Sequence, residues 1–72
     1  MNTIKLSPMD DTIEAGQIWW HIKSGNSYRV VLIAQRESDG EPMVCYQIVT
    51  KDGPVWVRPL YEWAGRFVRV PE

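Results

Sequence analysis

The chain has 72 residues, a formal net charge of −1 and a pI near 5.7, which leaves room for one small domain. Domains of this size bury only about 60% of their unfolded surface, so the core is thin and needs support. Cys45 is the only cysteine and His21 the only histidine, so an internal disulfide and a structural zinc site of about four ligands are both excluded.

Oligomerisation is the support that remains, and we expect a homo-oligomer, either a dimer or a higher assembly. The slightly acidic balance argues against nucleic acid as a general partner. No apolar run approaches the roughly 20 residues of a membrane span. Residues 1–16 lack the apolar centre of a signal peptide, so a cytoplasmic protein with no membrane partner is expected.

The pattern divides the chain into an N-terminal arm, residues 1–15, and a single domain, residues 16–72. The arm shows no sustained period, although Ile4, Leu6 and Ile13 could dock it on the domain. In the domain, Ile18, Trp20 and Ile22 stand at alternate positions of 17–22, which predicts a strand with these three residues on one face. Trp19 and His21 then lie on the opposite face.

The next strand is expected at 28–36, where Val30–Ala34 is apolar on both faces and should be buried on both sides. Asp39-Gly40 marks a hairpin turn into a return strand at 43–50. A turn at 51–54 leads to a short strand at 55–58, which Pro59 ends because proline donates no ladder hydrogen bond. One helical turn fits 60–65, and a last strand fits 66–70.

Five short strands with tight turns and almost no helix predict an all-β fold. We expect a small five-stranded antiparallel barrel or a strongly bent sheet, SH3-like in plan, with one short helical turn.

The order of motifs from Gly16 to Phe67 resembles a small prokaryotic and phage domain family of unknown function. The family pattern includes a His-x-Lys-Gly element, a Tyr-led strand, a Val-x-Tyr strand and a Trp-Val-Arg-Pro-Leu signature followed by an aromatic residue. This chain carries His21-Ile22-Lys23 before Gly25, then Tyr28, then Val44-Cys45-Tyr46. Its signature is Trp56-Val57-Arg58-Pro59-Leu60, followed by Trp63 where the family tends to have Phe.

Three departures from that pattern stand out. Ile18 replaces a tyrosine, Ser24 separates Lys23 from its glycine, and 36–39 replaces a His-Ser-Glu-Thr turn. The resemblance covers about three quarters of the chain and implies a compact β-rich fold. It implies no established activity, so it transfers no catalytic residue.

The chain shows no arrangement typical of an enzyme, a metal site or a cofactor site. Cys45 with His21 is the only Cys–His pair, and Cys45 lies among apolar strand residues where a small buried side chain fits. The carboxylates near 37–41 are typical of a solvated turn. We therefore expect no catalytic residue, no metal and no cofactor.

The eight aromatic side chains are too many for so small a core to hide. Trp20, Tyr46, Trp56 and Phe67 are the expected core, and Trp19, Tyr61 and Trp63 form a candidate exposed patch. Arg58 is expected on the sheet face opposite Trp56, and therefore outward if Trp56 is inward. The candidate ligand-binding residues are Trp19, His21, Lys23, Arg58, Tyr61 and Trp63.

Three functions fit these residues. The first is a non-enzymatic binding module in which rings stack on a base and Arg or Lys holds phosphates at an oligomer interface. The resemblance adds a phage-type setting, in which such a module would sequester a nucleotide signal used in host defence. The second is a protein-interaction module that inhibits a host enzyme through the Trp/Tyr/Arg patch. The third is single-stranded nucleic-acid binding on a β face, against which the acidic pI counts.

Overall fold

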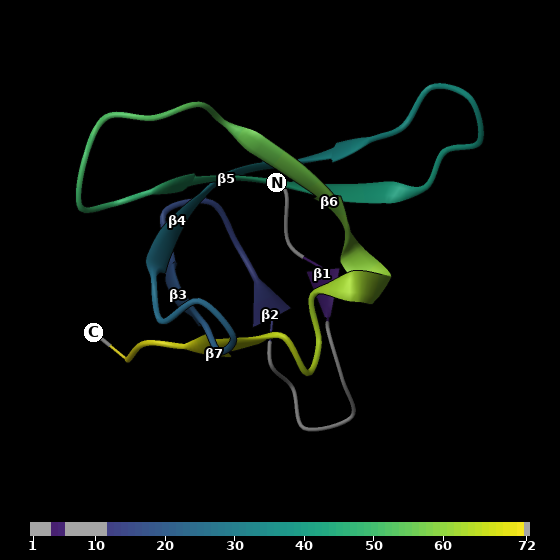
Figure 1. The fold of residues 1–72 in the computed structure, drawn as a ribbon. Helices are drawn as coiled ribbons and strands as arrows, with labels where there is room; N and C mark the ends of the chain where they lie inside the picture. Colours follow the sequence, from purple (N-terminus) through teal and green to yellow (C-terminus); the bar gives the residue numbers. More distant parts are fainter. Residues whose placement is uncertain (1–3, 6–11, 72) are drawn as a thin grey trace.

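The computed structural model describes residues 4–5 and 12–71, with side chains described from residue 13 onward. Its main feature is one antiparallel sheet whose strands lie side by side in the order β6-β5-β4-β3-β7 (Figure 1). The strands are β3 (Ile18–His21), β4 (Ser27–Gln35), β5 (Pro42–Ile48), β6 (Trp56–Pro59) and β7 (Phe67–Arg69). The predicted all-β class is confirmed.

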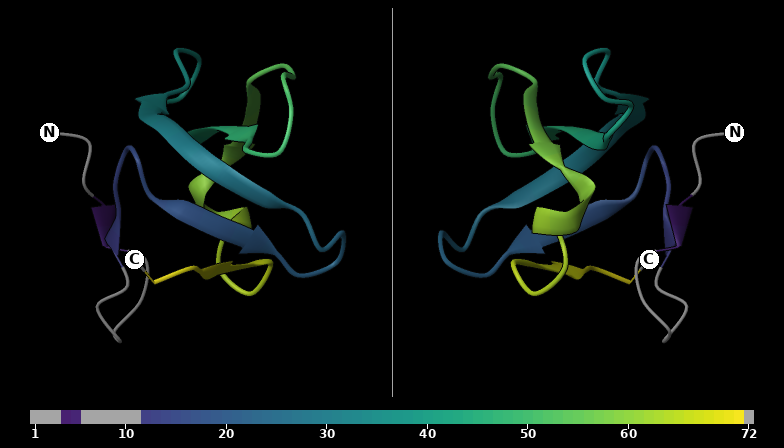
Figure 2. Two further views of the ribbon diagram at one scale, coloured as in Figure 1. Left: turned by 90° about the vertical axis from the view of Figure 1, so that its left-hand side faces the viewer. Right: turned by 90° about the vertical axis from the view of Figure 1, so that its right-hand side faces the viewer.

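The sheet bends strongly but does not close into a barrel, because no hydrogen-bonded pairing joins β6 to β7 among the described residues. A 3₁₀ turn, η1 (Leu60–Glu62), follows β6 and carries the chain across to β7 (Figures 1 and 2). The single helical turn expected after Pro59 is therefore present. Of the two architectures that the sequence allowed, the structure adopts the bent sheet.

A small separate hairpin of β1 (Ile4–Lys5) and β2 (Thr12–Ile13) precedes the sheet. Ile13 is fully buried in the core, so the docking expected for this residue is confirmed. The backbone N–H of Gly16 then donates to the carbonyl of Val30 at 2.8 Å, which attaches the segment to the sheet. Of the other two expected anchors, Leu6 lies outside the described residues and only the backbone of Ile4 is described.

The β4–β5 hairpin is the longest pairing in the sheet and contains a bulge between Val30 and Leu32. On either side of the bulge, Val30 and Ile33 both point into the core. Leu32 points outward and remains 40% exposed, with Val31 at 38%. The expectation that this strand is buried on both faces is thus wrong for the single chain, because the bent sheet encloses only the concave face of β4.

Four of the eight buried hydrophobic core residues described are aromatic, and their rings pack face to face and edge to face. Trp63 and Phe67 stack with centroids 3.6 Å apart and planes 3° from parallel. Trp19 meets Trp63 edge-on at 5.8 Å, and Tyr46 does so at 5.2 Å. Such pairs add to the stability that comes from burying their area.

Two expected core residues, Tyr46 and Phe67, are confirmed, whereas Trp20 and Trp56 are 46% and 52% exposed. Trp19 takes the inward place because its face of β3, which it shares with His21, is the concave one. Alternation separates the two faces of a strand but does not say which one the rest of the chain covers. Trp56 does pair with Tyr46 on β5, yet it is the first residue of β6 and stays half exposed.

Gln17 is the one polar residue among the described side chains that the core buries. Its Oε1 accepts hydrogen bonds from the Trp19 indole N–H at 3.0 Å and from the Glu14 backbone N–H at 3.1 Å. By contrast, the indole N–H of Trp63 is buried without a hydrogen-bond partner within the described part of the chain. An unpaired buried donor carries a desolvation cost of about 1–3 kcal/mol.

Candidate functional site

The structure separates the six predicted site residues into two groups. Trp19 and Trp63 are 2% and 0% exposed, so neither can offer a ring to a ligand or a partner. Tyr61 is 67% exposed on η1. The expected exposed patch of Trp19, Tyr61 and Trp63 therefore does not exist as a surface.

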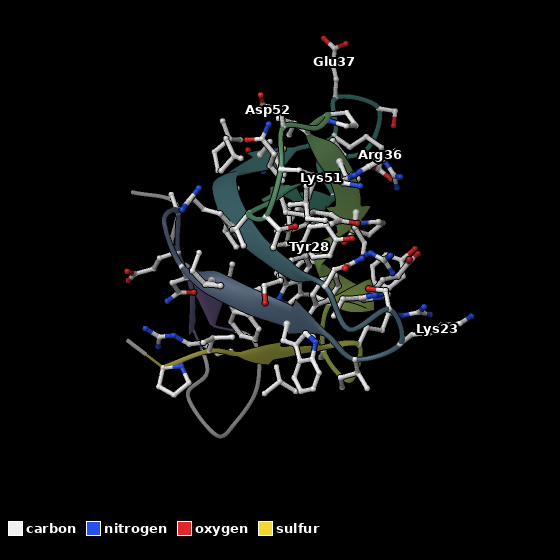
Figure 3. All side chains as sticks on the ribbon, turned by 60° about the vertical axis from the view of Figure 1, so that its left-hand side comes forward. Lys23, Tyr28, Arg36, Glu37, Lys51 and Asp52 are labelled. Atoms are coloured by element: carbon white, nitrogen blue, oxygen red, sulfur yellow. The ribbon has the colours of Figure 1, made fainter. Side chains whose placement is uncertain are left out.

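His21, Lys23 and Arg58, in contrast, are brought together at one end of the bend. His21 ends β3, and Lys23 lies in the following turn, whose sharp reversal is completed by Gly25 at a φ of 73°. Figure 3 shows Lys23 at the tip of this turn, at the opposite end of the molecule from Glu37 and Asp52. Positive φ is a conformation that glycine adopts without steric cost, so the turn fixes where Lys23 projects.

The imidazole of His21 is held from two sides. Its Nδ1 lies 2.8 Å from the Ser24 hydroxyl and accepts the Ser24 backbone N–H at 3.3 Å. Its ring packs on Phe67, with centroids 4.8 Å apart, and faces Tyr28 edge-on at 6.4 Å. Because a backbone N–H can only donate, Nδ1 is an acceptor and the ring proton belongs on Nε2.

The pKa of His21 is lowered from its usual 6.5, first by burial and then by the positive charges of Arg58, Arg66 and Lys23. Burial and nearby like charge both disfavour the imidazolium. The hydrogen bond from Ser24 also indicates a neutral imidazole, because it needs an unprotonated Nδ1 to accept it. His21 is therefore a neutral donor at pH 7, surrounded by three cations.

Arg58 points into the bend and is not the outward residue expected from the sequence. Residues two apart on a strand share a face, so Arg58 lies on the same concave side as Trp56. Its Nε donates to the Tyr46 hydroxyl at 3.3 Å, and its guanidinium lies 5.4 Å from the centre of the Phe67 ring. Its Nη1 is 3.7 Å from a Glu62 carboxylate oxygen.

A shallow recess of about 190 Å³ opens beside His21. Its lining combines cations with a small apolar floor: His21, Ile22, Lys23, Gly65 and Arg66. Arg66 is the member that the sequence-based site omitted. The sequence did offer a signal for Arg66, because it directly precedes Phe67, a predicted core residue on a short strand. The neighbour of an inward-facing ring on a strand faces the surface.

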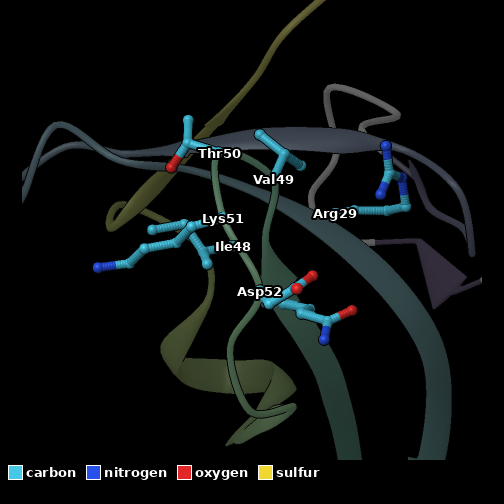
Figure 4. A pocket seen from close by; sticks show the side chains of 7 residues that line it. Arg29, Ile48, Val49, Thr50, Lys51 and Asp52 are labelled. Atoms are coloured by element: carbon cyan, nitrogen blue, oxygen red, sulfur yellow. The ribbon is translucent and has the colours of Figure 1, made fainter.

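A second, larger recess of about 420 Å³ lies under the β5–β6 loop and is lined mainly by polar residues of that loop. Arg29 and Lys51 are its two cations. Figure 4 shows the Lys51 ammonium directed away from the side on which Arg29 lies, so the two charges do not converge. The recess beside His21 is thus the better candidate for holding an anion.

The fold and this cluster define a small β domain in which cationic side chains lie beside packed aromatic rings. In sequence, residues 17–70 match the family described as Protein of unknown function (DUF1653), and the chain belongs to that family. The expected membership in a family of unknown function is confirmed. No curated protein and no solved structure matches the chain. Within the described residues, no helix is long and apolar enough to cross a membrane.

Proposed function

We propose that this protein is a non-enzymatic binding module that holds an anionic ligand in the recess beside His21. The observation that carries the proposal is the recess that Lys23 and Arg66 line together with His21, whose ring packs on Phe67, with the Arg58 guanidinium on the same Phe67 ring. Like charges placed together are stabilised when an anion enters between them. Lys23 and Arg66 line the recess, and His21 adds an uncharged N–H donor.

The recess has the size of one phosphate or carboxylate group with a small attached body, which favours a nucleotide-like ligand as the finer proposal. Trp19 and Trp63 cannot stack on its base, so the aromatic contact falls to the His21 ring. Sequestration of a nucleotide signal by a cytoplasmic phage-type protein is the setting that the sequence resemblance favours.

The proposal includes a homo-oligomer. Leu32, Cys45 and Val57 pair across three neighbouring strands and form an outward apolar row. Leu32 and Val57 are 40% and 56% exposed. A second copy that covers this row would give β4 the burial on both faces that its apolar composition favours.

Calorimetry against pyrophosphate and a panel of linear and cyclic nucleotides tests the ligand. We expect Lys23→Gln and Arg66→Gln each to weaken binding about tenfold or more, the scale of one hydrogen bond to a charged group. Lys51→Gln is the matched control, because Lys51 lies at the other recess and its loss should leave affinity unchanged. Binding that is insensitive to Lys23 and Arg66, or no binding of any panel member, would overturn the proposal.

The effect of Arg58→Ala must be interpreted separately, since Arg58 also donates a hydrogen bond to Tyr46 and lies over the Phe67 ring. A ligand role predicts a loss of about 1.5–3 kcal/mol in binding free energy. A purely structural role predicts a lower melting temperature with unchanged affinity at a temperature where the variant is folded. Measuring both quantities on the same preparation distinguishes the roles.

A further inference from the structure

The convex face beside strand β7 carries apolar side chains that nothing in the described part of the chain covers. Trp20 is 46% exposed, Ile22 53%, Val68 49% and Val70 37%. Trp20 pairs directly with Val68, so their side chains adjoin on one face. The Trp20 indole also reaches over the β3–β4 turn, where a Cβ on Gly25 would lie 3.9 Å from its nitrogen. Contiguous exposed apolar patches of this kind mark interaction surfaces.

The backbone of β7 is the edge of the sheet, because β7 is last in the strand order and pairs with β3 (Figure 2). The Val70 N–H donates to the Ile18 carbonyl at 2.9 Å, and the Ile22 N–H donates to the Arg66 carbonyl at 3.0 Å. In an antiparallel ladder, alternate residues face the partner strand. The backbone groups of Arg69 therefore point away from β3, toward the open edge.

Within the two described segments that form this edge, 18–26 and 65–70, the charges have one sign. Lys23, Arg66 and Arg69 are the charged residues of 18–26 and 65–70, and neither segment contains a carboxylate. A second copy added strand to strand would bring the Arg69 side chains of both copies close together in one short ladder, and like charges across a sheet are destabilising. Charge complementarity thus selects an acidic occupant over a second copy of this chain.

We infer that β7 and the patch of Trp20, Ile22, Val68 and Val70 form a docking edge for an extended segment of another protein in which acidic and apolar residues alternate. The added strand bonds to the Arg69 backbone. Because side chains alternate across a strand, its apolar residues cover Trp20 and Val68 while its acidic residues lie on the face that carries Arg69. This surface is distinct from the patch of Trp19, Tyr61 and Trp63, two of which are buried.

The probe is a synthetic peptide of about six residues, the usual length of a strand, in which glutamate and valine alternate. A peptide of the same length that alternates lysine and valine is its control. Amide and indole resonances of the ¹⁵N-labelled full chain report where each peptide binds. We expect the acidic peptide to shift the amides of 67–70 and the indole of Trp20, which Trp20→Phe assigns, and the basic peptide to shift neither.

Variants then separate the contributions of the apolar patch, the positive charge and the backbone N–H of the edge strand. Trp20→Ala should lower affinity at least about fivefold, as expected for an aromatic residue central to an interface. Arg69→Ala should lower it up to about fivefold, and Arg69→Glu should reverse the preference toward the lysine peptide. Arg69→Pro removes the edge N–H without touching the β3 ladder, so it should cost about two- to tenfold more than Arg69→Ala.

The results also separate this inference from the anion site. Equal binding of both peptides, shifts confined to the recess beside His21, or no shift at about 1 mM acidic peptide would overturn the docking edge. Self-association through β7, detected as shifts of 67–70 that depend on protein concentration alone, would also overturn it. Loss of nucleotide binding in Lys23→Gln with unchanged peptide binding would leave the two surfaces independent.

Discussion

Replacing Trp63 tests whether this residue is a buried core ring or a ligand contact. Its side chain is fully buried, stacks on Phe67 at 3.6 Å, and meets Trp19 and Tyr46 edge-on. Truncation of a buried Trp to Ala costs about 3–5 kcal/mol. At about 0.05–0.15 kcal/mol per residue, a chain of this length has a total stability of about 4–11 kcal/mol. Trp63→Ala therefore removes a large share of the free energy of unfolding.

Urea denaturation and thermal melting followed by circular dichroism measure the effect. For a domain of this size each kcal/mol shifts the melting temperature by about 4–8 °C, so we expect a fall of at least about 12 °C. Trp56→Ala is the matched control, because Trp56 is 52% exposed and its cross-strand pairing is worth about 1 kcal/mol at most. Trp63→Phe should cost less than Trp63→Ala, since it keeps a ring and removes the unpaired indole N–H.

A melting temperature for Trp63→Ala within about 4 °C of the wild type would refute the reasoning. If such a variant also lost ligand affinity, Trp63 would belong to the binding surface, as the sequence pattern suggested. Equal losses for Trp63→Ala and Trp56→Ala would show that the ring stack contributes no more than a half-exposed strand residue.

Three further predictions concern other parts of the molecule. His21, the only histidine, should have a pKa below 6.5 when titrated by NMR, and Arg66→Gln should raise that pKa. Because the pKa of His21 is lower in the folded than in the unfolded chain, the free energy of unfolding should fall as the pH drops below about 6.5 toward the folded pKa. Burial raises the pKa of the Cys45 thiol, so Cys45→Ala should preserve ligand binding and lower the free energy of unfolding by on the order of 1 kcal/mol, measured by denaturation. Loss of ligand binding in a folded Cys45→Ala variant would contradict a structural role for Cys45. Light scattering should give a dimer or larger mass for the wild type and a monomer for Leu32→Glu; a monomeric wild type would end the oligomer proposal.

Much of the fold was predictable because turns and alternation are local properties. Asp39-Gly40 marked the β4–β5 hairpin, where Gly40 has a φ of 76°, and Arg36 pairs with Asp39 at 2.7 Å across the same turn. Pro59 marked the region where β6 ends. The bulge between Val30 and Leu32 was not predictable, since an apolar run gives no sign of an extra residue in one strand.

The site was only partly predictable, because the facing of each strand depends on the bend of the whole sheet. His21, Lys23 and Arg58 do converge, but Trp19 and Trp63 are core residues. The inward position of Arg58 is possible because Tyr46, Phe67 and Glu62 supply partners for a guanidinium that would otherwise be costly to shield from water. Tyr46 comes from β5, whereas Glu62 and Phe67 follow Arg58 within nine residues, and only the folded chain brings all three around the guanidinium.

The four tryptophans divide into two kinds, and this division gives the protein its own optical reporters. Trp19 and Trp63 lie edge to face in the core, with planes 75° apart, so their coupled transitions should dominate the near-ultraviolet circular dichroism and vanish when packing is lost. Trp20 and Trp56 are half exposed on opposite faces of the sheet, and their emission should respond to quenchers in water. In Trp56→Phe, the remaining quenchable emission comes from Trp20, so the fluorescence of unlabelled protein can report whether the β7 edge is occupied. The near-ultraviolet circular dichroism of Trp19 and Trp63 then shows in the same sample that the fold is intact.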